Sequence, residues 1–392
     1  MGKMSLDVCV VTPGTFPVPA ARGSSVETVV FQVGKAIDKR IRLCIIGRKT
    51  SRQPSRGLRH GIVFERVSYR NPRHYIHAAD KRIRALNPRI IQIENRPRFA
   101  KRIKKIHPDK QVWLSLHSTT FISKPHIAPA EARNCLQYAD RIIVNSNYLR
   151  EEVAGLAPRL RDRIVVNHLG VDPKVFVARW DGEQLKLRQK LLVDKGLVNK
   201  KVILFVGRLI QRKGVHHLLE MMPELIRRHP DAVLVIVGGA RYGSNRITPY
   251  VRMLHQKGER LPNHIRFVPY VPYDKIREWF LLGDVLAVPS DQREAFGLVN
   301  VEAMAAGIPV IATNAGGIKE VVEHGVTGYL VDPQNLRQEL LERVSELLDD
   351  PQLRRKMGEM GVHRVKSHFT WDHTACRLAG LYRDALSMKN QA

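Results

Sequence analysis

Long apolar runs are missing from this sequence of 392 residues. A helix that spans a bilayer needs about 20 consecutive apolar residues, and no run here approaches that length. Near the amino terminus only LDVCVV (6–11) is apolar, and it is too short and too early for a secretory signal. We therefore expect a soluble, cytoplasmic protein.

Cysteine is scarce and scattered. The four cysteines, Cys9, Cys44, Cys135 and Cys376, form no C-x-x-C motif. This spacing excludes a zinc framework and a dithiol redox motif. We expect reduced thiols, most of them buried as small apolar side chains.

Acidic residues are few relative to basic ones, and the net charge is +28. Residues 1–170 hold 32 Lys and Arg against 12 Asp and Glu. An excess of this kind favours an anionic partner for the first half of the chain, or a solvated basic surface that only aids solubility. Zinc-finger spacing is absent, and aromatic and basic residues alternate only in SYRNPRHYIH (68–77). Nucleic acid is therefore not the expected partner.

Short β-branched runs recur, each followed by a turn and a helical pattern. They lie at 7–12, 41–46, 90–93, 112–116 and 141–145, and again at 202–206, 233–237, 265–268, 285–288 and 309–312. Runs that are apolar on both faces fit parallel strands covered by helices on both sides. The pattern predicts an α/β protein with two Rossmann-like, doubly wound domains.

The expected domains are residues 1–178 and 179–370, followed by a helix at 371–392 that docks back towards the first domain. Residues 48–61 (RKTSRQPSRGLRHG) are interpreted as a basic, flexible loop. Ligands of open parallel sheets bind at the carboxyl ends of the strands. Unusual polar residues occupy these ends in both halves, so we expect the two domains to face each other across a central cleft.

Two glutamates frame the stretch REAFGLVNVEAMAAG (293–307). Glu294 precedes a predicted helix at 296–306 and Glu302 lies about two turns into it. Ionised carboxylates accept hydrogen bonds only, which suits the hydroxyl groups of a sugar and a ribose. Arg208 and Lys213, in GRLIQRKG, suit two linked phosphates. Alternatively, Glu294 only caps the helix, and Glu302, Arg208 and Lys213 are ordinary surface residues.

GRLIQRKG (207–214), the E-x7-E pair and NHLGVDPKVF (167–176) resemble glycosyltransferase family 4. This resemblance implies the GT-B fold and a retaining enzyme that uses a nucleotide sugar. Residues 90–125 are similar to a subset associated with bacterial spore coats.

The resemblance also implies roles for individual residues. Arg208 and Lys213 hold the diphosphate, Glu294 contacts the donor sugar, Glu302 contacts the ribose, and His117 lies beside the reacting carbon. The family's remaining donor contacts correspond to the backbone amides of Phe296, Gly297 and Leu298, to Gly23 in a glycine-rich loop, and to Val268 and Pro269 near the base. This chain has Gly23-Ser24 where the family usually has two glycines.

The sequence contains no D-x-D motif, so it offers no aspartate pair to hold a divalent ion on the diphosphate. We expect no cofactor and no metal, a UDP-sugar or GDP-sugar donor, and a glycan, lipid, protein or anionic acceptor. The basic segment 96–107 is either an amphipathic helix on an anionic membrane surface or a solvated outer helix.

Two alternatives to a hexosyltransferase stay open. One is a catalytically silent basic protein of a spore coat, or another polyanion-binding protein, on a GT-B fold. The other is a GT-B sugar-nucleotide epimerase. The location is then the cytoplasm, the periphery of a membrane or the spore coat.

Overall fold

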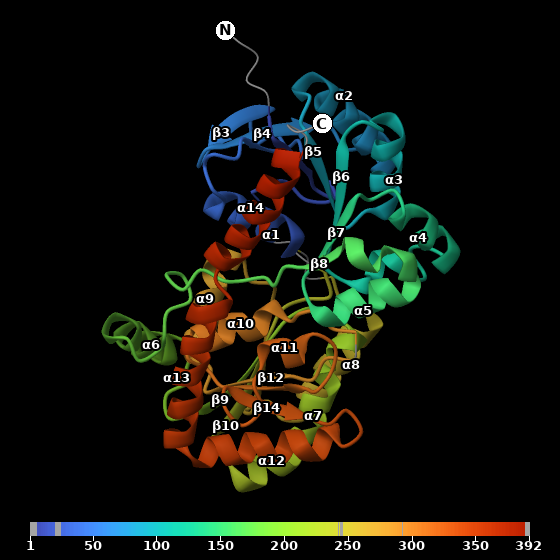
Figure 1. The fold of residues 1–392 in the computed structure, drawn as a ribbon. Helices are drawn as coiled ribbons and strands as arrows, with labels where there is room; N and C mark the ends of the chain where they lie inside the picture. Colours follow the sequence, from blue (N-terminus) through green and yellow to red (C-terminus); the bar gives the residue numbers. More distant parts are fainter. Residues whose placement is uncertain (1–5, 20–24, 242, 244–245, 292, 389–392) are drawn as a thin grey trace. The chain divides into compact units, whose positions relative to one another are not determined.

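The computed structural model describes residues 6–19, 25–241, 243, 246–291 and 293–388 (Figure 1). The chain divides into two compact units. Unit 1 contains the residues up to Leu169 together with those from Trp371 onward, and unit 2 contains Gly170–Thr370.

Unit 1 is built on a sheet with the strand order β3-β4-β2-β1-β5-β6-β7-β8. All neighbouring pairs are parallel except β3 and β4. The inner strands are buried along all or nearly all of their length, as the runs of Val and Ile predicted. The strands are β1 (Val8–Val11), β2 (Leu43–Arg48), β3 (Arg56–Arg59), β4 (Ile62–Val67), β5 (Ile90–Glu94), β6 (Gln111–Leu116), β7 (Arg141–Val144) and β8 (Ile164–Val166).

The helices of unit 1 include one from the far end of the chain. The last helix, α14, packs beside α1 (Figure 1), and the rings of Tyr382 and Trp113 lie 5.1 Å apart between their centroids. Trp113 is fully buried within β6 and is therefore a core residue. The helices are α1 (Ser25–Ala36), α2 (Pro72–Leu86), α3 (Pro97–Ile106), α4 (Pro129–Leu136), α5 (Asn147–Leu156) and α14 (Trp371–Met388), with 3₁₀ turns at Thr119–Ile122 and Pro158–Arg163.

The prediction of a flexible loop at 48–61 was wrong for its last part. Residues Arg56–Arg59 form β3, which pairs antiparallel with β4 at the edge of the sheet. The sequence RGLR has no β-branched residue, so only backbone hydrogen bonds to β4 make this segment a strand. The strands β4, β8 and β14 (Gly328–Val331) were also not predicted.

Helix α3 does not present an apolar face to solvent. Phe99, Ala100 and Ile103 are buried in the core of unit 1. On its polar side, Arg98 pairs with Glu131 in a bidentate arrangement. The apolar face is thus already occupied, which favours the solvated outer helix over a helix that inserts into lipid.

Unit 2 contains a fully parallel sheet with the strand order β11-β10-β9-β12-β13-β14. Its central strands are buried on both faces; all six residues of β10, AVLVIV, are examples. The strands are β9 (Lys201–Val206), β10 (Ala232–Val237), β11 (Ile265–Val268), β12 (Val285–Val288), β13 (Val310–Thr313) and β14.

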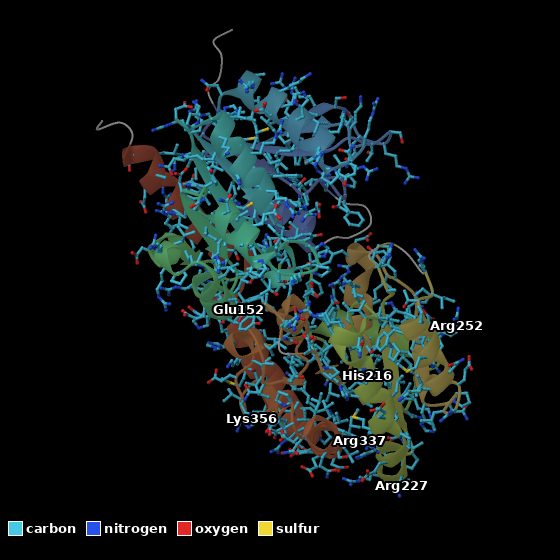
Figure 2. All side chains as sticks on the ribbon, turned by 90° about the vertical axis from the view of Figure 1, so that its right-hand side faces the viewer. Glu152, His216, Arg227, Arg252, Arg337 and Lys356 are labelled. Atoms are coloured by element: carbon cyan, nitrogen blue, oxygen red, sulfur yellow. The ribbon has the colours of Figure 1, made fainter. Side chains whose placement is uncertain are left out.

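Helices α7, α8 and α12 share one apolar core with β9 and β10, and α7 lies against α12 (Figure 1). Figure 2 shows His216 near the beginning of α7 and Arg227 near its end. Helices α10 and α13 also pack together. The helices are α6 (Gly182–Asp194), α7 (Val215–Arg228), α8 (Pro249–Gly258), α9 (Tyr273–Leu282), α10 (Leu298–Ala305), α11 (Ile318–Val321), α12 (Leu336–Asp349) and α13 (Pro351–His368), with a 3₁₀ turn at Gln211–Lys213.

Unit 1 ends at Leu169, whereas the sequence placed the domain boundary at 178. The segment that follows Leu169 packs within unit 2. The ring of Phe176 lies 5.5 Å from that of Phe280 and 5.9 Å from that of Tyr273, between centroids. Within the described ranges, none of the helices has the length and apolar character that crossing a membrane requires.

Candidate functional site

The loop after β9 reaches the end of β12 through a backbone contact. Gly214 has φ +68°, and a Cβ atom there would lie 1.9 Å from the carbonyl oxygen of Pro289. Only glycine allows this approach, because a side chain would overlap that oxygen and strain the backbone. The contact brings the loop that carries Lys213 next to the loop that carries Glu294.

Lys213 donates a hydrogen bond to the carboxylate of Glu294. Both side chains are about one-fifth exposed. Burial raises the pKa of Glu294, but the attraction of Lys213, Arg208 and Arg212 is stronger and the pKa is lowered overall. Glu294 is therefore ionised at neutral pH.

Backbone contacts fix the position of this pair. The amide of Asp291 donates to the carbonyl of Arg212 at 2.8 Å, and the Arg212 guanidinium pairs with the Asp291 carboxylate at 3.2 Å. The amide of Gly317, after β13, donates to the carbonyl of Glu294 at 2.9 Å. Three loops that follow β9, β12 and β13 thus meet at Glu294, as parallel strands require.

Arg208 follows β9 through Gly207, where another close contact occurs. A Cβ atom on Gly238 would lie 1.9 Å from the carbonyl oxygen of Gly207. The positive charge of Arg208 is close enough to Glu294 to lower its pKa. The structure therefore brings Arg208, Lys213 and Glu294 together, as the sequence predicted.

Glu302 lies in α10 and is 7% exposed. Burial raises its pKa to about 8, although a hydrogen bond from Tyr273 lowers it. The Tyr273 pKa is raised as well, through burial and the nearby Glu302. Glu302 is therefore neutral at pH 7 in the free protein, in contrast to Glu294, so the two glutamates differ in protonation.

The start of α10 also lies at the carboxyl-terminal end of the strands of unit 2. Gly297 has φ +80° and precedes the helix, where the first N–H groups lack partners inside the helix. Phe296 and Gly297 are buried and Leu298 is half-buried. A helix start of this kind attracts anions.

Several buried polar side chains near this edge lack a hydrogen-bond partner among the described residues. They are Ser290 after β12, Thr313 at the end of β13, and Asn300 in the first turn of α10, at both its Nδ2 and its Oδ1 atoms. Buried polar groups are normally paired. Their position at the strand ends is consistent with a site for a polar ligand.

His117 follows β6 in unit 1 and is held from both neighbouring strand ends. Its amide donates to Asn95 Oδ1 at 2.9 Å, and its carbonyl accepts from Asn145 Nδ2 at 3.2 Å. Asn95 has φ +53°, an uncommon conformation for a residue other than glycine. The Nε2 atom of His117 lies 2.7 Å from Glu94 Oε2.

The predicted site residues thus fall into two groups. His117 belongs to unit 1, whereas Arg208, Lys213, Glu294 and Glu302 belong to unit 2. In unit 2, Val268 ends β11 and is half-buried. Gly23 lies outside the described residues. Groups of three or more His, Cys, Asp or Glu side chains that could hold a metal ion do not occur among the residues described.

Sequence reasoning assigned no role to two residues that contact the predicted ones, or to two more that connect to them through hydrogen bonds. Tyr273 bonds Glu302, Glu94 bonds His117, and Tyr382 is connected to Glu94 through Gln92. Glu94 is the last residue of the buried strand β5, so its place at a strand end was the one available signal. Tyr273 and Tyr382 lie in helices far along the chain, and no spacing connects them to their partners.

Models of known protein families match both units. The model "Glycosyltransferase Family 4" matches residues 26–175, and the model "Glycosyl transferases group 1" matches residues 187–364. The putative glycosyltransferase YtcC of Bacillus subtilis is 32% identical over 375 residues, which cover 96% of this chain and 91% of YtcC. The chain belongs to glycosyltransferase family 4.

Another relative of this glycosyltransferase is the spore coat protein SA of Bacillus subtilis, 29% identical over 96% of this chain and 99% of that protein. Two solved structures share the fold. HepE of Anabaena in complex with UDP-glucose has a TM-score of 0.77 and 22% identity, and the match covers 96% of this chain and 99% of that one. Sucrose-phosphate synthase of Thermosynechococcus elongatus has a TM-score of 0.78 and 22% identity, and the match covers 97% of this chain and 100% of that one. The fold is therefore GT-B, with two Rossmann-like domains.

Proposed function

We propose that this glycosyltransferase moves a sugar from a nucleoside diphosphate donor, UDP or GDP, to a hydroxyl-bearing acceptor, with retention of configuration and without a metal ion. The observation that carries the proposal is the Lys213–Glu294 pair with Arg208 beside it, where three loops of unit 2 meet. Two cations suit the diphosphate and the carboxylate suits the sugar hydroxyls.

In the proposed reaction the bond between the anomeric carbon and the diphosphate oxygen breaks. Arg208 and Lys213 then stabilise the negative charge that develops on the leaving diphosphate. The acceptor oxygen forms the new bond on the same face of the sugar, and its proton passes to the departing phosphate oxygen. Glu294 orients the sugar through its hydroxyls, and Glu302 accepts hydrogen bonds from the ribose.

Relatives support the class of donor and of acceptor. HepE was crystallised with UDP-glucose, and a relative from Corynebacterium glutamicum, 34% identical over 255 residues, is a D-inositol 3-phosphate glycosyltransferase. An acceptor with an anionic group also suits unit 1, because residues 1–170 hold most of the excess positive charge. We propose such an acceptor, either a glycan or a lipid-linked sugar, and a location in the cytoplasm, at an anionic membrane or in a spore coat.

Calorimetry with UDP and GDP tests donor binding directly. We expect one nucleotide to bind, and Lys213→Ala to weaken binding at least tenfold. Lys257→Ala is the matched control, because Lys257 forms a comparable pair with Glu220 that joins α8 to α7 and includes no residue of the three loops. Equal effects of both variants, or no binding of any nucleotide or nucleotide sugar, would refute the proposal. Mass spectrometry of products from a nucleotide-sugar panel then identifies the sugar.

A further inference from the structure

A chain of buried hydrogen bonds leads from the last helix to His117. Tyr382 Oη donates to Gln92 Oε1 at 2.6 Å, and Gln92 Nε2 donates to Glu94 Oε1 at 2.6 Å. Glu94 Oε2 lies 2.7 Å from His117 Nε2. Tyr382, Gln92 and Glu94 are at most 5% exposed, so water does not compete for these bonds.

This series of hydrogen bonds from Tyr382 to His117 has a direction. With Tyr382 as the donor at one end, the Gln92 amide turns its NH₂ group towards Glu94. An ionised carboxylate only accepts hydrogen bonds, so Glu94 then takes one from Gln92 and one from His117. This direction makes His117 Nε2 the donor to Glu94, and the tautomer with its proton on Nε2 has a lone pair on Nδ1. Ser115 Oγ, 3.3 Å from Nε2, can share the same proton.

The other ring nitrogen has no protein partner. His117 Nδ1 and Asn145 Oδ1 are both enclosed, and neither atom has a hydrogen-bond partner among the described residues of the chain. Both residues line one cavity of about 50 Å³ in unit 1, together with Val30 from α1 and Leu378 from α14. Two acceptor atoms at one cavity suit a group that donates hydrogen bonds, such as an alcohol.

We propose that Glu94 is a positioning residue that fixes His117 with its proton on Nε2, so that Nδ1 accepts a hydrogen bond from a hydroxyl group of the substrate. Tyr382, acting through Gln92, holds the Glu94 carboxylate in place. Helix α14 thereby contributes to the site through a side chain 265 residues from His117 in sequence. Only the identity of the hydroxyl-bearing substrate rests on the proposed function; the proton position does not.

Glu94→Gln is the sharpest variant because it keeps the shape of the side chain. Its amide oxygen accepts from Gln92 and its NH₂ group then faces His117 Nε2, which must become the acceptor. The proton of the ring moves to Nδ1, and that atom can no longer accept from a hydroxyl. Glu65→Gln is the control: Glu65 is a buried glutamate of β4 that pairs with Arg56 and Arg82. Among the described residues, it shares no hydrogen bond with Gln92 or Glu94.

Nitrogen-15 NMR of protein labelled at histidine, with the His117 signals assigned by their loss in His117→Asn, reads the proton position at neutral pH. We expect a protonated Nε2 and an unprotonated Nδ1 in the wild type and in Glu65→Gln, and the reverse in Glu94→Gln. A wild-type proton on Nδ1, or Glu94→Gln with an unchanged pattern, overturns the proposal. Should Glu94→Gln fail to fold, the wild-type spectrum decides alone. Tyr382→Phe then tests the first hydrogen bond of the series, and Tyr329→Phe is its control.

Kinetics give a second readout where the proposed transfer is observed. Glu94→Gln should lower kcat by up to about 100-fold, because misplacement of a group beside the reacting atoms has effects of this size, with the donor KM within about threefold of wild type. An unchanged kcat contradicts the proposal. Absence of any transfer by the wild type refutes the proposed function instead, while the NMR result still decides the role of Glu94.

Discussion

Glu294 and Lys213 form an ion pair although 81 residues separate them in sequence. The pair exists because Gly214 lets the loop after β9 contact the backbone at Pro289. A carboxylate and an ammonium group in this partly buried setting depend on each other, since removal of one leaves the other charge uncompensated. This mutual dependence makes the pair a testable centre of the unit 2 site.

A double-mutant cycle on Lys213→Ala and Glu294→Ala should therefore show a coupling free energy of about 1–3 kcal/mol in chemical unfolding. The exposed pair of Arg228 and Glu224 is the control, with an expected coupling of about 0.3–0.5 kcal/mol. Because the pKa of Glu294 is lowered on folding, the coupling is complete above pH 4.5 and declines as the pH falls through the folded pKa. Additive single effects would show that the two groups act independently.

The pH dependence of stability should reveal Glu302. Its pKa rises from 4.5 to about 8 on folding because the carboxyl is buried. The contribution of Glu302 to stability is therefore greatest below pH 4.5 and declines as the pH increases towards 8. Glu302→Gln should remove this decline and be more stable at pH 8 by a few kcal/mol, since one pKa unit corresponds to about 1.4 kcal/mol. Urea unfolding of both proteins from pH 4.5 to 8.5 measures the difference; parallel curves would contradict a buried, neutral Glu302.

Nucleotide binding should release a proton. Glu302 is neutral at pH 7 in the free protein, and we expect it to ionise when the ribose hydroxyls donate to it, because a carboxylate accepts hydrogen bonds more strongly than a neutral carboxyl group. Calorimetry in buffers of different ionisation enthalpy should detect release of about one proton at pH 7, and none for Glu302→Gln. Tyr273→Phe removes the hydrogen bond that lowers the pKa of Glu302, so the midpoint of the release should move to higher pH. Binding without proton exchange in the wild type would place the ribose elsewhere.

Gly214→Ala should damage the fold and the nucleotide site together. The new Cβ meets the Pro289 oxygen, and φ +68° is unfavourable for alanine. We expect a loss of at least about 2 kcal/mol of unfolding free energy and a loss of nucleotide binding. Gly155→Ala is the control: nothing lies within 4 Å of its Cβ position in α5, and stability should rise by up to about 1 kcal/mol. Wild-type nucleotide affinity in Gly214→Ala would show that the loop contact does not shape the site.

Much of the fold could be predicted from the sequence, because parallel strands buried on both faces require continuous apolar runs. All five runs of the second half became strands β9 to β13, and the first half gave β1, β2, β5, β6 and β7. Strand β3 could not be predicted, since its pairing with β4 and not its own residues makes it a strand. The sequence likewise indicated which polar residues end strands, and Arg208, Lys213 and Glu294 did come together.

What the sequence determined by itself is the family, the two Rossmann-like folds and the edge of each sheet where polar residues gather. These follow from local patterns that repeat along the chain. Only the tertiary structure decided that Glu302 is neutral beside Tyr273, and that Tyr382 of the last helix donates a hydrogen bond to Gln92. The reason is physical: protonation depends on burial and on neighbours, and these neighbours come from segments that only folding brings together.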